Sequence, residues 1–358
     1  MACADAIWRI FIFPKGSRND ENSLLQLLGV IRPKETRKFS SLGGPGFRRM
    51  HEVIQHVGTA SRLDCWRLEA RDTIDSLIAS LDDFAKLEPS WETLVRMAKS
   101  LCIKYVPGQD TLPDLRRMAD KSRDKVHENT LLQHQIFLLY EEITHAMNYG
   151  DIGRLEHAFP AWSMIFAGCG KHKYSAELMR YLTDVHFRYP PGLKYGVRKA
   201  VRYNILINPT GKEGHWRGID WLVEHNNLYM KQIYSGKFSN HQIDHIINES
   251  PLIEVYKNNR RQLEKMFCLA RKGTKHASPD MTSTYKKLSA YMAEKKTNER
   301  VPSRSAKYVV TNAMEKGMEM VRERRGGRTG GDPVKDQWDG LPEETEIGED
   351  DGDLEDLV

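Results

Sequence analysis

The sequence predicts a mainly helical protein, a multi-helix globular body followed by a disordered acidic tail. Apolar residues recur at spacings of three and four along most of the chain, as they do on one face of a helix. No segment alternates apolar and polar residues between hairpin turns, and neither a βαβ rhythm nor an internal repeat is present. We therefore expect amphipathic helices that stack on one another.

The first half of the chain begins with an apolar segment at residues 4–12, which fits a helix or a strand. Ser90 is expected to cap the helix that follows it, because a serine hydroxyl can accept a hydrogen bond from an unpaired first-turn amide. The helix that contains Gly58 is expected to be interrupted near that glycine. Helices are predicted at 23–29, 47–70, 73–87, 90–105 and 129–149.

The second half continues the helical pattern from Asp151, a candidate N-cap, to the glycines at 168–170. Pro160 lies inside this segment and is expected to kink it, because proline lacks the amide hydrogen that a helix interior uses. A loop is expected at 208–218, between two helices. Further helices are predicted at 173–188, 193–207, 220–234, 239–249, 251–271, 279–297 and 303–323.

Charge is divided unevenly along the chain. The net charge of +5 separates into +16 on residues 1–331 and −11 on residues 332–358. The basic body either attracts polyanions such as nucleic acid or simply presents a solvated charged surface. Residues 324–358 are predicted to be disordered, because so charged a segment buries too little apolar surface to offset its ordering entropy. This tail either solubilises the chain or folds back and competes with an anionic partner.

Several classes of protein are not supported by the sequence. No apolar run approaches the roughly 18 residues of a membrane span, and the first residues lack the basic region and cleavage site of a signal peptide. The five cysteines form no CxxC pair, so neither a disulfide framework nor a cysteine-based zinc site is indicated. Walker, GxGxxG and GxSxG motifs are also missing. We expect an intracellular protein with no membrane partner.

Unusual chemistry is concentrated between Asn204 and Ile233, where a basic loop with glycines leads into a helix. On that helix Glu224, Asn227 and Lys231 fall at spacings of three and four and so share one face. A carboxylate there could be one ligand of a hard divalent cation near phosphate, if Asp220, Asp184 or the pair Glu141 and Glu142 approaches it. The alternative is structural, with Glu224 bound by loop amides or by an arginine.

Basic residues next to tyrosines form the second candidate site. The mixture of positive charge and aromatic rings beside Tyr174, Tyr195 and Tyr203 suits contact with phosphates and stacking on bases. The same residues also fit core tyrosines with basic neighbours that reach the solvent. The candidate nucleic-acid-binding residues are Lys171, Lys173, Arg198, Lys199, Arg202, Lys212, Arg217 and Lys231.

Two weaker patterns complete the candidate sites. His241 and His245 stand four residues apart, with Glu249 one turn further on, which is a metal-ligand spacing without a general base. Surface histidines give the same pattern. The segment RERRGGR at 322–328 suits a flexible nucleic-acid contact, a nuclear-import signal or a solvated linker.

Several blocks of the chain, in order, resemble the fungal domain of unknown function 6589 family. They are RPKETRKFSS and FRRMHEVIQHVG near the start, GDIGRLEHAFPAW (150–162), GCGKHKYSAELMRYLTDV (168–185), NPTGKEGHWRGIDWLVEHNNLYMK (208–231) and ESPLIEVYK (249–257). The resemblance implies a transposase-type ancestry, with this chain as the C-terminal part of a ribonuclease-H-like fold that carries a helical insertion. It divides the chain into a partial family domain at 1–272, additional helices at 273–323 and the tail.

The resemblance also implies that Glu224 matches the last metal-binding and catalytic acid, whose partners are expected upstream of Met1. We therefore expect a truncated, transposase-derived protein that binds nucleic acid, with DNA as the expected partner, through residues 194–231 and without competent catalysis. No cofactor is expected. The alternatives are a helical protein-interaction or structural domain, and a metal-dependent DDE-type nuclease using Mg or Mn. DNA binding would favour the nucleus over the cytoplasm. The oligomeric state is not predicted.

Overall fold

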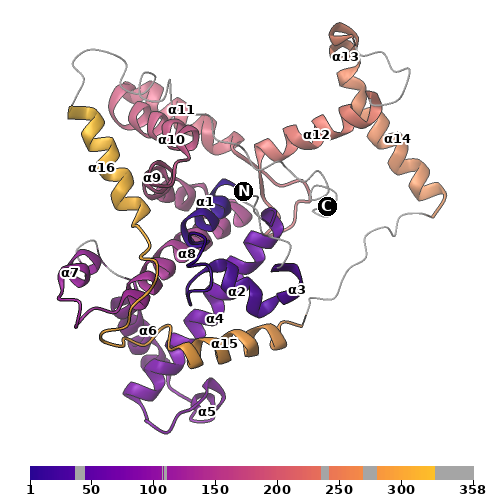
Figure 1. The fold of residues 1–358 in the computed structure, drawn as a ribbon. Helices are drawn as coiled ribbons and strands as arrows, with labels where there is room; N and C mark the ends of the chain where they lie inside the picture. The colour runs from indigo at the N-terminus through magenta and orange to yellow at the C-terminus, as the bar shows by residue number, and fades with distance from the viewer. Residues whose placement is uncertain (37–44, 107, 109–110, 235–241, 269–279, 327–358) are drawn as a thin grey trace.

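The structure of the chain is a computed structural model that describes residues 1–36, 45–106, 108, 111–234, 242–268 and 280–326. The mainly helical fold predicted from the sequence is confirmed (Figure 1). The helices in chain order are α1 (Ala2–Phe11), α2 (Leu24–Ile31), α3 (Pro33–Thr36), α4 (Phe47–Thr73), α5 (Leu81–Ala85), α6 (Trp91–Tyr105), α7 (Thr111–Arg117), α8 (Lys125–Tyr149), α9 (Ile152–Cys169), α10 (His172–Thr183), the π-helical turn η1 (Asp184–Arg188), α11 (Pro191–Asn204), α12 (Ile219–Tyr234), α13 (Ile243–Glu249), the 3₁₀ turn η2 (Ser250–Leu252), α14 (Ile253–Met266), α15 (Thr282–Lys295) and α16 (Ala313–Gly326).

Side-chain caps start several of the central helices. The Ser90 hydroxyl accepts a hydrogen bond from the Thr93 amide at 3.3 Å, and Asp151 Oδ1 accepts one from the Arg154 amide at 3.0 Å. Both predicted caps are confirmed. Asp124 starts α8 in the same way, although the sequence pattern suggested a start at residue 129. These bonds satisfy amides that have no partner within their own helix.

The hydrophobic core forms where α1, α2, α4, α8 and α9 pack together. The 27 residues of α4 run through Gly58 without the predicted interruption. A Cβ at Gly58 would lie 3.0–3.3 Å from Glu141, Arg62 and Phe137. The glycine therefore lets α8 approach α4 closely, and the pattern reflects helix packing instead of a helix break. α9 also continues through Pro160 as one helix, and the kink expected there stays a prediction.

The predicted helix at 73–87 is wrong. α4 ends at Thr73, and helical structure resumes only at the five residues of α5. The Asp75 carboxylate accepts a hydrogen bond from the Leu77 amide at 2.9 Å, which is a local turn that competes with the helix. Ile78 and Phe84 are instead buried in a small separate cluster with residues of α4 and α6.

Residues 303–312 also differ from the predicted helix at 303–323, since α16 begins only at Ala313. Buried polar side chains from other elements take the place of helical hydrogen bonds here. Asp20 Oδ2 accepts from the Tyr308 amide at 3.2 Å, and Asn129 Oδ1 accepts from the Val310 amide at 2.8 Å. Sequence periodicity carries no information about such long-range partners.

The helices after residue 272 share the core of the preceding ones. Leu288 and Met292 of α15, with Val310 and Ala313, belong to the same buried cluster as α1, α4 and α8. α16 packs closely along α9, and a Cβ at Gly168 would lie only 1.9 Å from the Ala313 carbonyl oxygen. Residues 282–326 are therefore part of one body with the helices that precede them (Figure 1).

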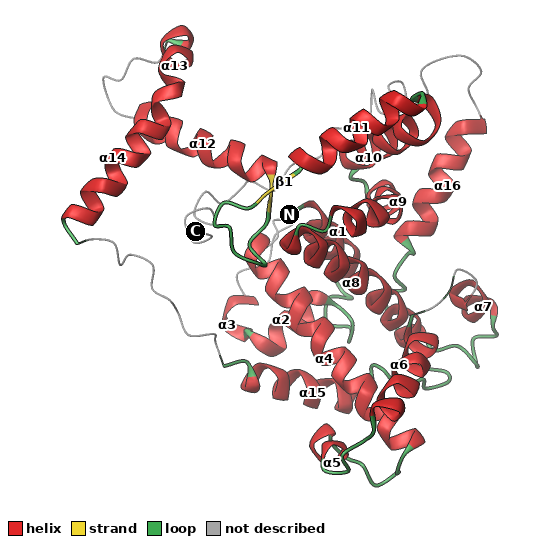
Figure 2. Ribbon diagram, turned by 180° about the vertical axis from the view of Figure 1, so that it is seen from behind, coloured by secondary structure: helices red, strands yellow, loops and turns green. Residues whose placement is uncertain are grey.

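The remaining described elements extend from this body. α12, α13 and α14 project as an arm in both views (Figure 2). The sheet found among the described residues pairs β1 (Leu206–Ile207) with β2 (Arg217–Gly218), antiparallel, so the helix predicted at 193–207 ends earlier, at Asn204. That sheet is much smaller than a ribonuclease-H-like core requires. Of the predicted tail, residues 327–358 lie outside the described residues, and 324–326 complete α16.

Candidate functional site

α11 presents two parallel rows of side chains. Residues four apart lie on one face of a helix and are separated by about 6 Å along its axis. The first row, which we call the arginine row, consists of Lys194, Arg198 and Arg202. The second, the tyrosine row, consists of Tyr195, Lys199 and Tyr203. No residue of α11 is fully buried, so the helix keeps its polar and aromatic side chains at the surface.

These two rows line an open groove of about 910 Å³. Its opposite rim is the turn from α8 to α9, and its end is formed by the segment that precedes α11. We call this feature the basic groove. Its lining residues are Gly150, Asp151, Ile152, Gly153, His186, Tyr189, Pro191, Lys194, Tyr195, Arg198, Lys199, Arg202 and Tyr203.

Glu156 of α9 holds the arginine row in place from beneath. Its Oε2 accepts hydrogen bonds from Arg198 Nη2 at 2.9 Å and from Arg202 Nη2 at 2.7 Å, and its Oε1 accepts from the Tyr181 hydroxyl at 2.9 Å. Burial would raise the pKa of Glu156, but the hydrogen bonds from Arg202, Arg198 and Tyr181 outweigh it and lower the pKa to about 2. The carboxylate is therefore ionised and joins α9, α10 and α11.

The β-hairpin supports the opposite rim. The Trp216 amide donates a hydrogen bond to the Asn148 carbonyl at 3.1 Å, and the Trp216 ring covers Gly150. Gly150 has φ +70°, and a Cβ there would lie 2.7 Å from the indole. Only glycine fits this position, since both the left-handed backbone and the aromatic contact exclude a side chain. Trp216 of the hairpin therefore holds the turn between α8 and α9 in place.

The structure brings three of the predicted nucleic-acid-binding residues, Arg198, Lys199 and Arg202, into the basic groove. Lys171 lies elsewhere. Its side chain is buried, its Nζ is 2.7 Å from Asp5 Oδ2, and it stands over the Tyr174 ring. It therefore joins α1 to the start of α10, and its charge is already matched inside the protein.

The other predicted basic residues do not line the groove. Lys173 is exposed on α10, Lys212 is exposed in the loop of the hairpin, and Lys231 is exposed near the end of α12. Arg217 is half-buried in β2, where its Nη1 donates to the Trp216 carbonyl at 3.0 Å. These four residues are spread over several elements of the surface.

Glu224 lies on the exposed face of α12, together with Asn227 and Lys231, so the predicted shared face is confirmed. Within the described ranges Glu224 makes no hydrogen bond or ion pair, and no group of three or more His, Cys, Asp or Glu is placed to hold a metal ion. The acids considered as its partners bind other residues, as in the contact of Glu141 with Arg62 at 2.8 Å.

The remaining acids and the histidine pattern are likewise engaged or incomplete. Asp184 binds Arg188 at 3.1 Å, Glu142 binds Arg154, and Asp220 accepts from the Trp221 amide at 2.9 Å. His245 Nε2 lies 3.4 Å from Glu249 Oε1, whereas His241 falls outside the described residues.

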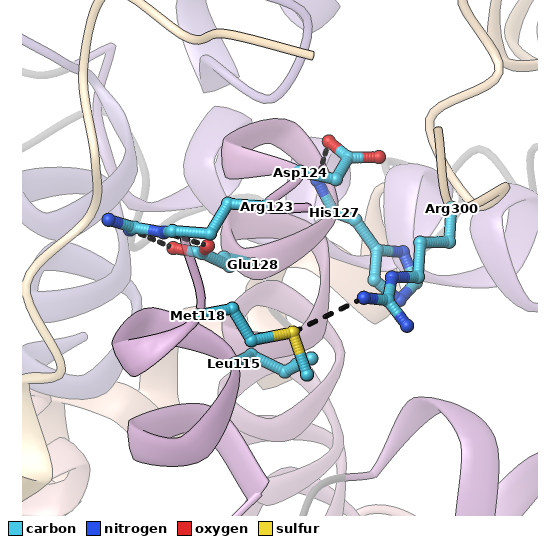
Figure 3. Close-up of a pocket in the computed structure, with 7 residues that line it drawn as sticks. All are labelled: Leu115, Met118, Arg123, Asp124, His127, Glu128 and Arg300. Carbon is cyan, nitrogen blue, oxygen red and sulfur yellow. Dashed lines mark hydrogen bonds and ion pairs between the residues drawn. The ribbon is translucent and has the colours of Figure 1, made fainter. Parts of the chain in front are cut away.

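A second hollow lies at the start of α8 and is much smaller, about 10 Å³ (Figure 3). Its charged side chains already have partners within the lining (Figure 3): Arg123 donates to both oxygens of Glu128 at 2.9 and 2.8 Å, and Arg300 Nη2 donates to the neutral Met118 Sδ at 3.4 Å. A space of this size admits at most one water molecule. The basic groove is therefore the candidate site.

Comparison with known proteins agrees with the blocks noted in the sequence. The family model described as "Family of unknown function (DUF6589)" matches residues 1–276. The chain belongs to this family. The matched part includes the whole basic groove, the hairpin and the arm, and it ends before α15. No curated protein and no solved structure matches the chain. Within the described ranges, no helix has both the length and the apolar character needed to cross a bilayer.

Sequence reasoning missed several residues of the groove. Lys194 was detectable, because it continues the four-residue spacing of Arg198 and Arg202. Tyr189, His186 and the turn at Gly150–Gly153 come from other elements, and nothing in the sequence joins them to α11. Glu156 lies within the family block at 150–162, but its neighbours in the sequence do not indicate that it binds two arginines.

Proposed function

We propose that the chain binds nucleic acid, with the basic groove contacting the phosphate backbone. The observation that carries this proposal is the row of Lys194, Arg198 and Arg202 beside Lys199 in one open groove of about 910 Å³. Successive positions of the row are about 6 Å apart along the helix axis, so the row can follow a chain of phosphates. Phosphate neutralisation by lysine and arginine dominates affinity for nucleic acid.

The charge of the groove remains positive after its internal pairs are counted. Glu156 offsets one of its four Lys or Arg charges, and Asp151 at the rim offsets another. Each arginine uses Nη2 for Glu156, and a guanidinium has five N–H donors, so each keeps donors for a second acceptor. The hydrogen bond to Glu156 also raises the pKa of Arg202 further, which keeps it charged.

A salt titration tests the proposal directly. The unmodified chain is expected to bind a labelled oligonucleotide with an affinity that falls steeply between about 50 and 200 mM salt. The double variant Lys194→Gln/Lys199→Gln is expected to lower the salt slope by about two, since each phosphate contact contributes about one. Neither lysine belongs to the ion triad that Glu156 forms with Arg198 and Arg202, so the fold should be preserved.

Matched lysines serve as the control. Lys286 and Lys287 are exposed on α15, which lies at the end of the body away from α11 (Figures 1 and 2). Lys286→Gln/Lys287→Gln removes the same charge and should leave the salt slope unchanged. An equal loss in both double variants would show nonspecific attraction to the whole body, and no binding at low salt would favour the alternative of a helical interaction or structural domain.

We also propose, from the family resemblance alone, that the chain derives from a transposase-type protein and does not cleave nucleic acid as it stands. Incubation with DNA and Mg or Mn should leave the DNA intact. Cleavage that Glu224→Gln abolishes without unfolding the chain would establish the nuclease alternative. A DNA ligand would place the chain in the nucleus, which a fluorescent fusion can test.

A further inference from the structure

The tyrosine row of α11 indicates which form of nucleic acid the groove accepts, provided that the proposed function holds. The side chains of Tyr195 and Tyr203 both line the basic groove and are 69% and 75% exposed. They stand eight residues apart on one helix face, which corresponds to about 12 Å along the axis. Two large aromatic rings therefore lie at the surface on either side of Lys199.

Neither ring is occupied by another aromatic side chain among the described residues. Tyr195 makes a cation–π contact with Lys199, whose Nζ lies 6.0 Å from the centroid of the Tyr195 ring. By contrast, Tyr181 and Tyr174, which also lie near α9, pack their rings against Phe159 and Phe166. The tyrosines of α11 thus differ from Tyr174 and Tyr181, because they are mostly exposed and no aromatic side chain of the described residues covers them.

The two rows have complementary chemistry. The row of Lys194, Arg198 and Arg202 supplies positive charge for a backbone, and the adjacent row supplies the faces of Tyr195 and Tyr203. A duplex keeps its bases stacked on one another and paired, so it can offer phosphates but no base faces. An unpaired strand can offer both, because its bases turn outward and stack on aromatic side chains.

We propose that the basic groove binds single-stranded nucleic acid, with phosphates along the arginine row and bases stacked on Tyr195 and Tyr203. Stacking needs only a π face, so binding should depend little on base sequence. Asp151 at the rim carries a negative charge and already accepts the Arg154 amide at 3.0 Å. It directs phosphates toward the α11 side of the groove, where the cations lie.

The test compares three labelled ligands by fluorescence anisotropy: a DNA single strand, its duplex, and an abasic strand of the same length and backbone charge. The unmodified chain should bind the single strand about tenfold or more tightly than the abasic strand, from typical base–aromatic stacking. Tyr195→Ala and Tyr203→Ala should each weaken single-strand binding by about tenfold and leave duplex binding and the salt slope unchanged.

Two controls separate stacking from other effects. Tyr195→Phe and Tyr203→Phe keep the ring and should keep single-strand affinity, which a role for the hydroxyl would not allow. Tyr256→Ala removes an exposed tyrosine from α14, outside the groove, and should have no effect. Alanine is a good helix former, so the Ala variants should keep α11 folded, as circular dichroism can check.

The outcomes distinguish this inference from the proposed function. Equal affinity for all three ligands, with the Ala variants unchanged, would refute stacking while leaving phosphate binding in the groove intact. Preferential duplex binding would also overturn the inference. If no ligand binds even at low salt, both the inference and the proposed function fall.

Discussion

Glu156→Gln tests whether the ion triad holds α11 against α9. The ordinary carboxyl pKa of 4.5 falls to about 2 in the folded chain, and a difference of about 2.5 corresponds to roughly 3 kcal/mol of stability at neutral pH. The Arg198 and Arg202 side chains keep 34% and 45% of their surface exposed. Solvent screening therefore reduces our expectation to about 2 kcal/mol.

The pH dependence gives the sharper assay. Because the pKa of Glu156 is lowered on folding, its stabilisation is fully present above about pH 4.5 and is lost as the pH falls toward 2. Urea unfolding of the unmodified chain and of Glu156→Gln should therefore differ by about 2 kcal/mol at pH 7. The difference should fall by more than half between pH 5 and pH 3.

Either of two results would refute this reasoning. A difference below about 0.5 kcal/mol at pH 7 would place the triad among ordinary exposed ion pairs. A difference that is the same at pH 3 and pH 7 would mean that glutamine disturbs packing and not a charge. Glu213→Gln is the matched control, since Glu213 is exposed between β1 and β2, and it should change stability little at any pH.

Three further predictions concern the body. Gly168→Ala should cost at least about 2 kcal/mol in thermal unfolding, because its Cβ would meet the α16 backbone. Gly196→Ala, with open space around it, should instead stabilise α11 by about 0.5–1 kcal/mol, and similar effects at both sites would contradict the close packing of α9 and α16. Burial lowers the pKa of His127 and of His134 to about 4, so the free energy of unfolding should decline from about pH 6.5 toward 4 with an uptake of up to about two protons; a flat profile would oppose it. Asp124→Ala should cost about 3–5 kcal/mol by denaturant titration, because it removes the N-cap of α8 and the buried ion-pair partner of Arg304. Asp124→Asn should cost less, because asparagine can still cap the helix, and equal losses would show that the cap is not retained.

Local signals in the sequence predicted most helices but not the departures from them. The caps at Ser90 and Asp151 depend on residues three positions away, so a short window contains them. Residues 303–312 depend on Asp20 and Asn129, which lie far away in the chain. Gly58 shows the same limit, since its meaning as a packing contact is visible only once α8 is in place.

The candidate site was predictable in part for the same reason. Spacing along one helix groups Arg198, Lys199 and Arg202 without any knowledge of the fold, and the structure keeps them together. Lys171 also stands next to basic and aromatic residues in the sequence, but it forms an ion pair with Asp5, a residue of α1 that no local pattern indicates. Ring contacts decided the interpretation of the tyrosines: Tyr174 packs on Phe166, whereas Tyr203 is 75% exposed and packs on no aromatic ring of the described residues.

The packing of α15 and α16 into the core of α1 has a consequence for how the chain folds during synthesis. Leu288 and Met292 fill the same cluster as Ile7 and Phe11, so contacts that complete the core join the first and last parts of the described chain. Such contacts close very long loops, which slows folding and raises contact order. A nascent chain that ends at residue 276, where the family match ends, still exposes apolar surface on α4 and α9. Docking of α15 and α16 should therefore be needed before this apolar surface is covered.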